Sequence, residues 1–242
     1  MPQLPLLLFD IDGTILRSGD RVHGQSVRVA CERFFGIAAD TPIPAEVDLA
    51  GRTDRHIVTA LLAAHGIPRA ASAPRLPEIF AFMDEYVVRE ITPLTEYLLP
   101  GVAALLRELE RRDLALGLVT GNLPRIAEAK LAAAGVWEPF ARYGEIIGGF
   151  GDASAERNDL PPLALTLAGR VLGRAVAPSD AIVIGDTPHD IVCARANGLR
   201  AIAVTTGRYN AEQLRAYEPA LLLPDLSDHD AVLAFIGRQA GG

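Results

Sequence analysis

Short apolar runs alternate with helical stretches along much of this chain of 242 residues, and each run ends in small or polar residues. Apolar runs of this length are typical of strands buried on both faces, as in parallel sheets. The helical stretches between them then cover both faces of the sheet. We therefore predict an α/β fold, with strands at 4–10, 114–120, 143–148, 180–186, 200–206 and, at an edge, 220–223.

Residues 17–93 interrupt this alternation. Apolar residues fall at helical spacing in three segments that prolines and glycines divide, and no strand pattern intervenes. An insertion directly after the first strand lies over the crevice of such a fold and can act as a lid. We predict an all-helical cap domain at 17–93 and a core domain formed by 1–16 and 94–242.

Charge and composition exclude several classes of protein. The net charge of −7 and the absence of a basic cluster argue against a nucleic acid or an anionic membrane as partner. Cys31 and Cys193 lie far apart in apolar segments and are typical of small core residues in a reducing compartment. The N-terminus has no signal-peptide pattern, and no apolar run approaches the roughly 18 residues of a membrane span. We expect a cytoplasmic protein.

Asp10 and Asp12 stand one residue apart at the end of the first apolar run, and Gly13 then lets the chain turn away. In open α/β sheets the ligand crevice lies outside the carboxyl ends of the strands. Two carboxylates held close together there repel each other, and a cation, a shared proton or a reaction must offset that repulsion.

Three other segments end at the same edge of the predicted sheet. One holds Thr120, Gly121 and Asn122, one runs from Asp186 to Asp190, and a loop carries Arg157. Together they supply further carboxylates, a hydroxyl, a glycine amide and a cation. Carboxylate oxygens with spare positions suit Mg²⁺, so the set favours phosphoryl transfer.

Within such a site the two leading carboxylates can take different roles. Asp10 and Asp186 are the natural ligands of the cation. One member of the pair can attack phosphorus, and the other can donate and withdraw a proton. Thr120, the Gly121 amide and a cationic side chain would hold the phosphoryl oxygens.

The three motifs together resemble the haloacid dehalogenase-like hydrolase superfamily. They are D-x-D-G-T at 10–14, T-G-N at 120–122 and G-D-T-x-x-D at 185–190, in the family's order and across the whole chain. The helical insertion is similar to the cap of phosphoglycolate phosphatases and β-phosphoglucomutases. This resemblance implies a Rossmann-like core with an inserted cap.

The resemblance also implies roles by position. Asp10 would be the nucleophile that forms an aspartyl-phosphate, Asp12 the general acid and base, and Thr120 a hydrogen-bond partner of the phosphoryl group. Mg²⁺ would bind Asp10, Asp186 and the main-chain carbonyl of Asp12. Asp190 would complete the metal site by orienting a water or the cationic side chain.

One motif departs from the family. The usual lysine before the fourth strand is absent, and alignment of the following helix puts Arg157 there. Arg157 is therefore the favoured phosphate-stabilising cation, with Lys130, the only lysine in the chain, as the competitor. A lysine on a helix usually faces solvent, which argues against Lys130. Arg52 resembles a cap residue that reaches the substrate and would bind a second anionic group, unless its segment is only a helix start.

Several activities occur within this family. A dehalogenase needs neither the D-x-D pair nor Mg²⁺, and a phosphonatase needs a cap lysine, which this chain lacks. We predict a Mg²⁺-dependent phosphatase acting on a small phosphomonoester, such as phosphoglycolate or a sugar phosphate, with Gly121, Asn122, Arg52 and Lys130 binding the substrate. A β-phosphoglucomutase-like phosphomutase is the alternative, and an inactive binding homologue a remote one.

Overall fold

A parallel sheet forms the centre of the computed structural model, which describes residues 5–44 and 47–239. Within these residues the sheet has six strands in the order β3-β2-β1-β4-β5-β6, and neighbouring strands are parallel throughout. The strands are β1 (Leu6–Phe9), β2 (Ala115–Val119), β3 (Gly148–Gly149), β4 (Ala181–Gly185), β5 (Arg200–Val204) and β6 (Leu221–Leu223).

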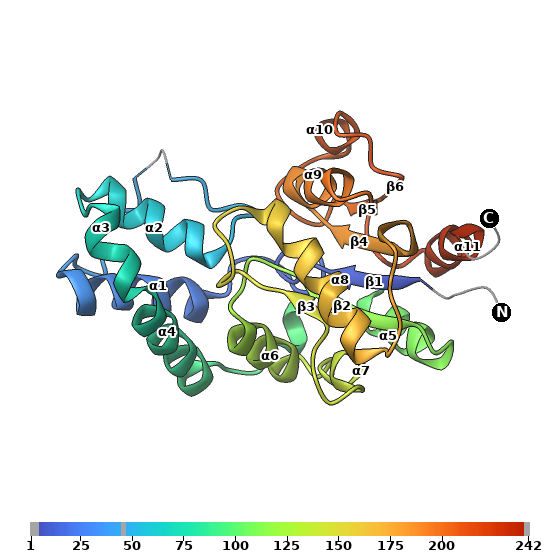
Figure 1. Ribbon diagram of the computed structural model, residues 1–242, viewed down its shortest axis with the longest axis horizontal. Coiled ribbons are helices and arrows are strands. Elements are labelled where there is room, and N and C mark those ends of the chain that lie inside the picture. The colour runs from blue at the N-terminus through green and yellow to red at the C-terminus, as the bar shows by residue number, and fades with distance from the viewer. Residues whose placement is uncertain (1–4, 45–46, 240–242) are drawn as a thin grey trace.

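Helices cover both faces of this sheet, which confirms the predicted α/β class (Figure 1). The α-helices are α1 (Arg21–Phe35), α2 (Asp54–Ala64), α3 (Arg69–Ser72), α4 (Leu76–Glu90), α5 (Val102–Arg111), α6 (Pro124–Ala133), α7 (Glu138–Ala141), α8 (Leu160–Val171), α9 (Pro188–Ala196), α10 (Ala211–Arg215) and α11 (His229–Gln239). Short 3₁₀ turns are η1 (Ala73–Arg75), η2 (Thr95–Tyr97), η3 (Arg157–Asp159) and η4 (Pro178–Asp180). None of the helices described here is both long and apolar enough to cross a membrane.

Strand β1 lies at the centre because its side chains are apolar on both faces. Leu7 and Phe9 are fully buried in a core with α5, α6 and α11, whereas Leu6 and Leu8 are fully buried against α8 and α9. Successive side chains of a strand point to opposite faces, so an unbroken apolar run serves both layers. Asp10 follows at the end of this buried strand, and its amide donates to the Ile184 carbonyl of β4 (2.9 Å).

Helices α1 to α4 follow β1 and precede α5, and they extend away from the sheet (Figure 1). Their buried apolar residues form a separate hydrophobic cluster, which also takes in Leu123 and Ile126 at the start of α6. The insertion is thus helical and packs on the core through α6. The boundaries predicted for a cap domain, residues 17–93, remain a prediction.

The strand predicted at 143–148 differs from the observed one. Strand β3 comprises only Gly148 and Gly149, while residues 143–147 lead into it without strand structure. Gly144 has φ of 77°, a left-handed conformation that turns the chain. The apolar pair Ile146-Ile147 therefore approaches the sheet from a turn, although the Ile147 carbonyl still accepts from the Leu118 amide (2.8 Å).

Candidate active site

Three buried carboxylates meet at the carboxyl ends of β1 and β4. Asp10 follows β1, Asp186 follows β4, and Asp190 lies in the first turn of α9; one oxygen of each lies within 4.8 Å of the others. All three residues are at most 3 % exposed. The pairing of β1 with β4 brings the two strand ends together although the residues lie far apart in sequence.

The Asp186 carboxylate packs closely against two glycines, Gly13 and Gly207. A Cβ atom added to Gly13 would lie 2.3 Å from Asp186 Oδ2, and one added to Gly207 would lie 1.7 Å from the same atom. Thr14 also donates its hydroxyl to Asp186 Oδ1 (3.1 Å). Gly13 has φ of 92°, so glycine there serves both the turn and the close approach.

The electrostatics of this cluster favour a cation. Burial and the neighbouring Asp190 raise the pKa of Asp186 to about 8. Burial is also the main reason that the pKa of Asp10 rises to about 6. Carboxylates with raised pKa values become stable as anions once a divalent cation binds, and oxygen donors suit Mg²⁺. The residues present therefore fit a divalent metal site.

Arg157 supplies a fixed cation beside these carboxylates. Its guanidinium lies 3.2 Å from Asp10 Oδ2 and donates to Asp190 Oδ1 at 2.5 Å. It also donates to the carbonyls of Gly51 and Val119 (3.1 Å each). Burial opposes its charge, but Asp10 and Asp190 outweigh burial and keep the Arg157 pKa above its usual value. Arg157 thus lies beside Asp10, the aspartate that the family resemblance predicts to be the nucleophile.

Asp190 is already held from two sides. Its Oδ2 accepts from the Thr187 amide (2.9 Å) and hydroxyl (2.7 Å), while Oδ1 accepts from Arg157. The bond from the Thr187 amide is half of a capping box at the start of α9, in which the Thr187 side chain accepts from the Asp190 amide. This arrangement agrees with an acid that orients the cation. It leaves Asp10 and Asp186 as the carboxylates best placed to bind a metal directly.

Asp12 lies among different partners. Lys130 Nζ donates to both of its carboxylate oxygens (2.9 and 2.8 Å), and Asn122 Nδ2 donates to Oδ2 (2.8 Å). Burial opposes ionisation, but Lys130 and these hydrogen bonds outweigh it and lower the pKa of Asp12. The expectation that a lysine on this helix faces solvent is wrong, because Lys130 is only 1 % exposed.

The segment after β2 approaches the inserted helices closely. Asn122 donates to the Thr120 hydroxyl oxygen through Nδ2 (2.8 Å) and its amide (3.3 Å), so the hydroxyl proton stays available for donation. A Cβ atom on Gly121 would lie 2.0 Å from the Arg52 carbonyl oxygen. The Gly121 carbonyl in turn accepts from the Asp54 amide (2.7 Å).

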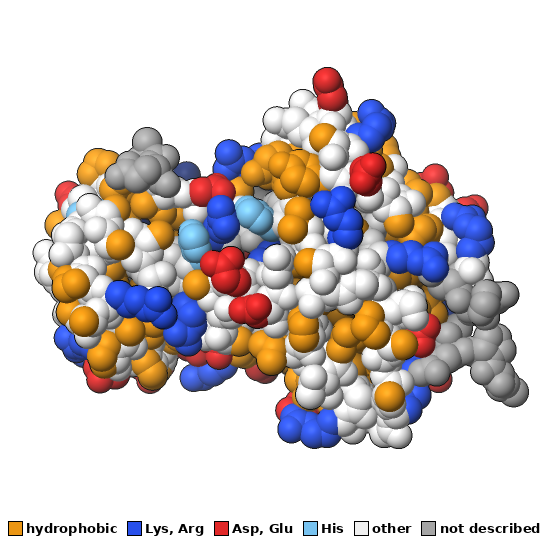
Figure 2. Space-filling view, turned by 45° about the horizontal axis from the view of Figure 1, so that its top comes forward, with side chains coloured by type: hydrophobic (Ala, Val, Ile, Leu, Met, Phe, Trp, Pro, Cys, Tyr) orange, Lys and Arg blue, Asp and Glu red, His pale blue; other side chains and the backbone are white. Residues whose placement is uncertain are grey.

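A cavity of about 550 Å³ connects these residues with the inserted helices. Its walls include the carboxylates of Asp10, Asp12 and Asp186, together with Gly121, Asn122, Lys130 and Arg157. Further basic residues on its walls are Arg17, Arg52 and Arg208. Figure 2 shows basic, acidic and histidine side chains together on the surface where the inserted helices meet the rest of the molecule.

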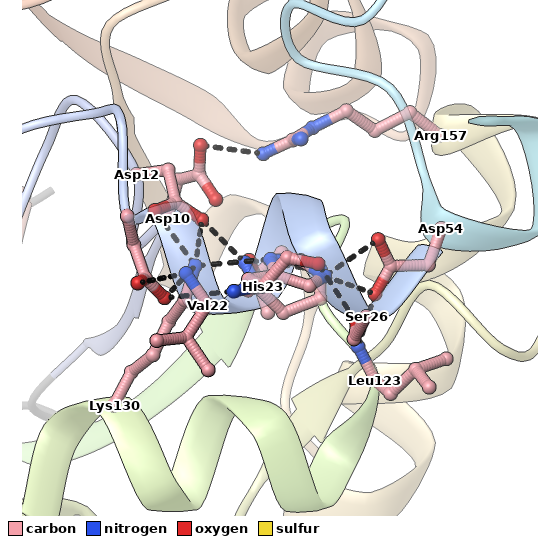
Figure 3. Close-up of polar contacts among 12 residues, drawn as sticks. Asp10, Asp12, Val22, His23, Ser26, Asp54, Leu123, Lys130 and Arg157 are labelled. Carbon is pink, nitrogen blue, oxygen red and sulfur yellow. Dashed lines mark hydrogen bonds and ion pairs between the residues drawn. The ribbon is translucent and has the colours of Figure 1, made fainter. Parts of the chain in front are cut away.

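His23 and Asp54 of the inserted helices were not among the site residues predicted from the sequence. His23 Nε2 contacts Asp54 (3.0 Å to Oδ1), and His23 Nδ1 lies 3.1 Å from Lys130 Nζ (Figure 3). The available signal was Asp20, whose carboxylate caps α1 and so places His23 in the first turn. That signal locates a helix start but does not say what His23 faces.

The model of the haloacid dehalogenase-like hydrolase family matches residues 4–198. The chain belongs to this family. That membership confirms the resemblance of the three motifs and makes the protein a hydrolase.

Relatives of this hydrolase extend over nearly its full length. It is 27 % identical over 235 residues to a Dickeya dadantii protein named "Probable phosphatase IndB", covering 93 % of this chain and 91 % of the relative. It is 26 % identical over 240 residues to phosphoglycolate phosphatase of Rhodospirillum rubrum, covering 98 % and 92 %.

Solved structures share the fold. CbbY from Rhodobacter sphaeroides, in complex with phosphate, matches with a TM-score of 0.63 at 23 % identity, over 93 % of this hydrolase and 96 % of CbbY. A β-phosphoglucomutase from Clostridium difficile matches with a TM-score of 0.61 at 16 % identity, over 98 % and 97 %. At these identities the likeness supports the architecture, including the inserted helices, and leaves substrate choice open.

Proposed function

We propose that this hydrolase is a Mg²⁺-dependent phosphatase that cleaves a small phosphomonoester through an aspartyl-phosphate on Asp10. The observation that carries the proposal is the setting of Asp10, buried at a strand end beside Asp186 and in contact with Arg157. Asp10 thus lies between the Arg157 guanidinium and Asp186, the carboxylate with which it would share a metal ion. The phosphatase names of the relatives support the same reaction.

In the first step a carboxylate oxygen of Asp10 forms a bond to phosphorus while the bond from phosphorus to the alcohol oxygen breaks. Protonated Asp12 gives its proton to the departing oxygen. In the second step water attacks the phosphorus of the aspartyl-phosphate, and the Asp12 carboxylate takes a proton from that water. The bond between phosphorus and the Asp10 oxygen breaks as the bond from water forms, so phosphate leaves and Asp10 is restored as a carboxylate.

The remaining residues hold the phosphoryl group. Arg157 would neutralise its charge, and the Thr120 hydroxyl with the Gly121 amide would donate to its oxygens. Asp10, Asp186 and the carbonyl of Asp12 would bind Mg²⁺, which when bound offsets the carboxylate charge and polarises the phosphoryl group.

We further propose a substrate with a second anionic group, such as phosphoglycolate or a sugar phosphate. Arg17, Arg52 and Arg208 line the cavity beyond the carboxylates, so a ligand there meets several cations. Arg52 Nε lies 3.5 Å from Asp48 Oδ2, a loose ion pair, and it makes no hydrogen bond to the described residues. Residues 17–93, acting as a cap, would enclose this part of the ligand.

The test is phosphate release from a panel of small phosphate esters, measured with Mg²⁺ and with a chelator. We expect turnover of at least one ester that depends on Mg²⁺, and loss of at least about 10³-fold in kcat on Asp10→Asn, with the variant still folded. Absence of turnover on every ester with Mg²⁺ present would refute the phosphatase. Conversion of a sugar 1-phosphate to its 6-phosphate without phosphate release would identify a phosphomutase instead.

A further inference from the structure

Lys130 is a buried cation without a place in the reaction proposed above. It is the only lysine of the chain, it is 1 % exposed, and it lies on α6 rather than at the end of a strand. Burying a charge costs free energy unless partners satisfy it, so its contacts indicate what it is for. Those contacts are with Asp12 and not with Asp10.

The ammonium group of Lys130 has three N–H donors and three close acceptors. Two donors go to the carboxylate oxygens of Asp12 (2.9 and 2.8 Å), and the third goes to His23 Nδ1 (3.1 Å). Asp20 lies farther away, at 4.0 Å. A lysine ammonium has no fourth donor, so none is left for a phosphoryl oxygen. This count favours Arg157 over Lys130 as the cation that holds phosphate.

The contacts continue into the inserted helices. Because Lys130 can only donate, His23 Nδ1 must accept, and the ring proton is therefore on Nε2. His23 Nε2 donates to Asp54 (3.1 Å to Oδ2), and the same Asp54 oxygen accepts from the Leu123 amide (2.9 Å). Leu123 directly precedes α6, the helix that carries Lys130. The chain of contacts thus runs from Asp12 through α1 and α2 and back to α6 (Figure 3).

We propose that Lys130 is a positioning residue for Asp12, and that His23 and Asp54 hold Lys130 in place. The inference rests on the proposed function, because it assigns Asp12 the proton transfers. When protonated Asp12 gives its proton to the departing oxygen, the carboxylate that remains is the form that Lys130 holds here. The same carboxylate then takes the proton from water. Docking of α1 and α2 on α6 is therefore part of setting the acid and base.

The inference predicts a dependence on the leaving group. An alkyl phosphate needs protonation of its leaving oxygen, whereas the p-nitrophenolate of p-nitrophenyl phosphate leaves readily without a proton. We expect Lys130→Met to lower kcat/KM about 10²-fold for an alkyl phosphate that the enzyme turns over, and less than about 5-fold for p-nitrophenyl phosphate. Arg125→Met is the matched control, since it removes an exposed cation from the same helix; it should leave both values within about 2-fold.

A double-mutant cycle separates positioning from a general structural role. In the Asp12→Asn background, Lys130→Met should change kcat/KM by less than about 2-fold, because the residue through which it acts is gone. Equal losses with the two esters, or additive losses in the cycle, would overturn the inference. Full activity of Asp12→Asn alone would refute the role of Asp12 and this inference with it, whereas the Asp10→Asn test of the phosphatase stands apart.

His23→Leu provides a second route if Lys130→Met does not fold. Loss of the ring removes one acceptor from Lys130 and one donor from Asp54, so we expect the same selective loss for the alkyl ester, about 10-fold. His23→Gln, which can still donate and accept, should recover part of it. A His23→Leu enzyme that treats both esters alike would contradict the inference on its own.

Discussion

At the scale of single residues, the site separates two cations that sequence reasoning treated as competitors. Arg157 contacts Asp10 and Asp190, whereas Lys130 contacts Asp12. Each carboxylate of the D-x-D pair thus has its own partner. The pKa of Asp10 is raised mainly by burial, and that of Asp12 is lowered because Lys130 outweighs burial. The lowered pKa means that Asp12 is held as a carboxylate, the form that can take a proton from water.

We predict that Arg157→Ala lowers both stability and activity. Removal of the guanidinium leaves Asp10 and Asp190 buried without their partner, and breaking a buried pair in this way costs about 3–5 kcal/mol of unfolding free energy. We expect kcat/KM to fall at least about 10²-fold for alkyl and p-nitrophenyl esters alike, since both need the phosphoryl charge stabilised. Arg157→Lys should recover part of the activity. Denaturant unfolding and steady-state kinetics measure the two effects, and full activity of Arg157→Ala would contradict this role.

At the scale of secondary structure, the inserted helices are tied to the loops that follow β2 and β3. The Asp54 amide donates to the Gly121 carbonyl (2.7 Å), and the Arg55 amide donates to the Gly151 carbonyl (3.0 Å). Arg55 Nε also donates to the Asp152 carbonyl (2.7 Å). These contacts need close backbone approach, which a side chain at Gly121 would prevent.

We predict that Gly121→Ala separates these elements. The new Cβ would lie 2.0 Å from the Arg52 carbonyl oxygen, so the start of α2 or the loop after β2 must move. We expect a loss of about 2 kcal/mol in unfolding free energy and of at least about 10-fold in kcat/KM. Gly237→Ala, in α11 with open space around the added atom, is the matched control and should slightly stabilise the protein. An active, stable Gly121→Ala enzyme would show that this approach is dispensable.

At the scale of the whole molecule, the buried carboxylates connect folding to protons and metal. Burial raises the pKa of Asp186 to about 8 and that of Asp10 to about 6, against an ordinary value of 3.8. Folded-state pKa values above the unfolded values mean that the folded protein prefers these groups protonated. Without a divalent cation their contribution to stability is present in acid and is lost as pH rises toward 8.

We predict that Mg²⁺ stabilises the protein more at higher pH. The cation competes with the protons on Asp10 and Asp186, so the increase in melting temperature on adding Mg²⁺ should be larger near about pH 8 than near about pH 5. Thermal unfolding with Mg²⁺ and with chelator at each pH measures this difference. Asp186→Asn should remove most of it. An increase that is the same at both pH values would contradict a metal site built on these carboxylates.

The sequence by itself determined the strands, apart from the one expected at 143–148, and the carboxylates that follow them. Short apolar runs indicate strands that are buried on both faces. In a parallel sheet the ends of these strands place Asp10 and Asp186 at one edge, whatever the details of packing. The family motifs lie at those strand ends, so the fold class and the family were predicted correctly. The roles of the individual site residues stay predictions that the experiments above test.

Only the tertiary structure decided which way the helical side chains face. Periodicity places Lys130 and His23 on helices, but burial of Lys130 depends on α1 and α2 packing against α6, and the two side chains are 107 positions apart in sequence. The local sequence does not predict such long-range packing. Burial of Lys130 is stabilised by Asp12, His23 and the surrounding apolar residues together. The pair Asp10 and Asp12 could therefore be predicted from the sequence. Lys130 as the partner of Asp12 could not.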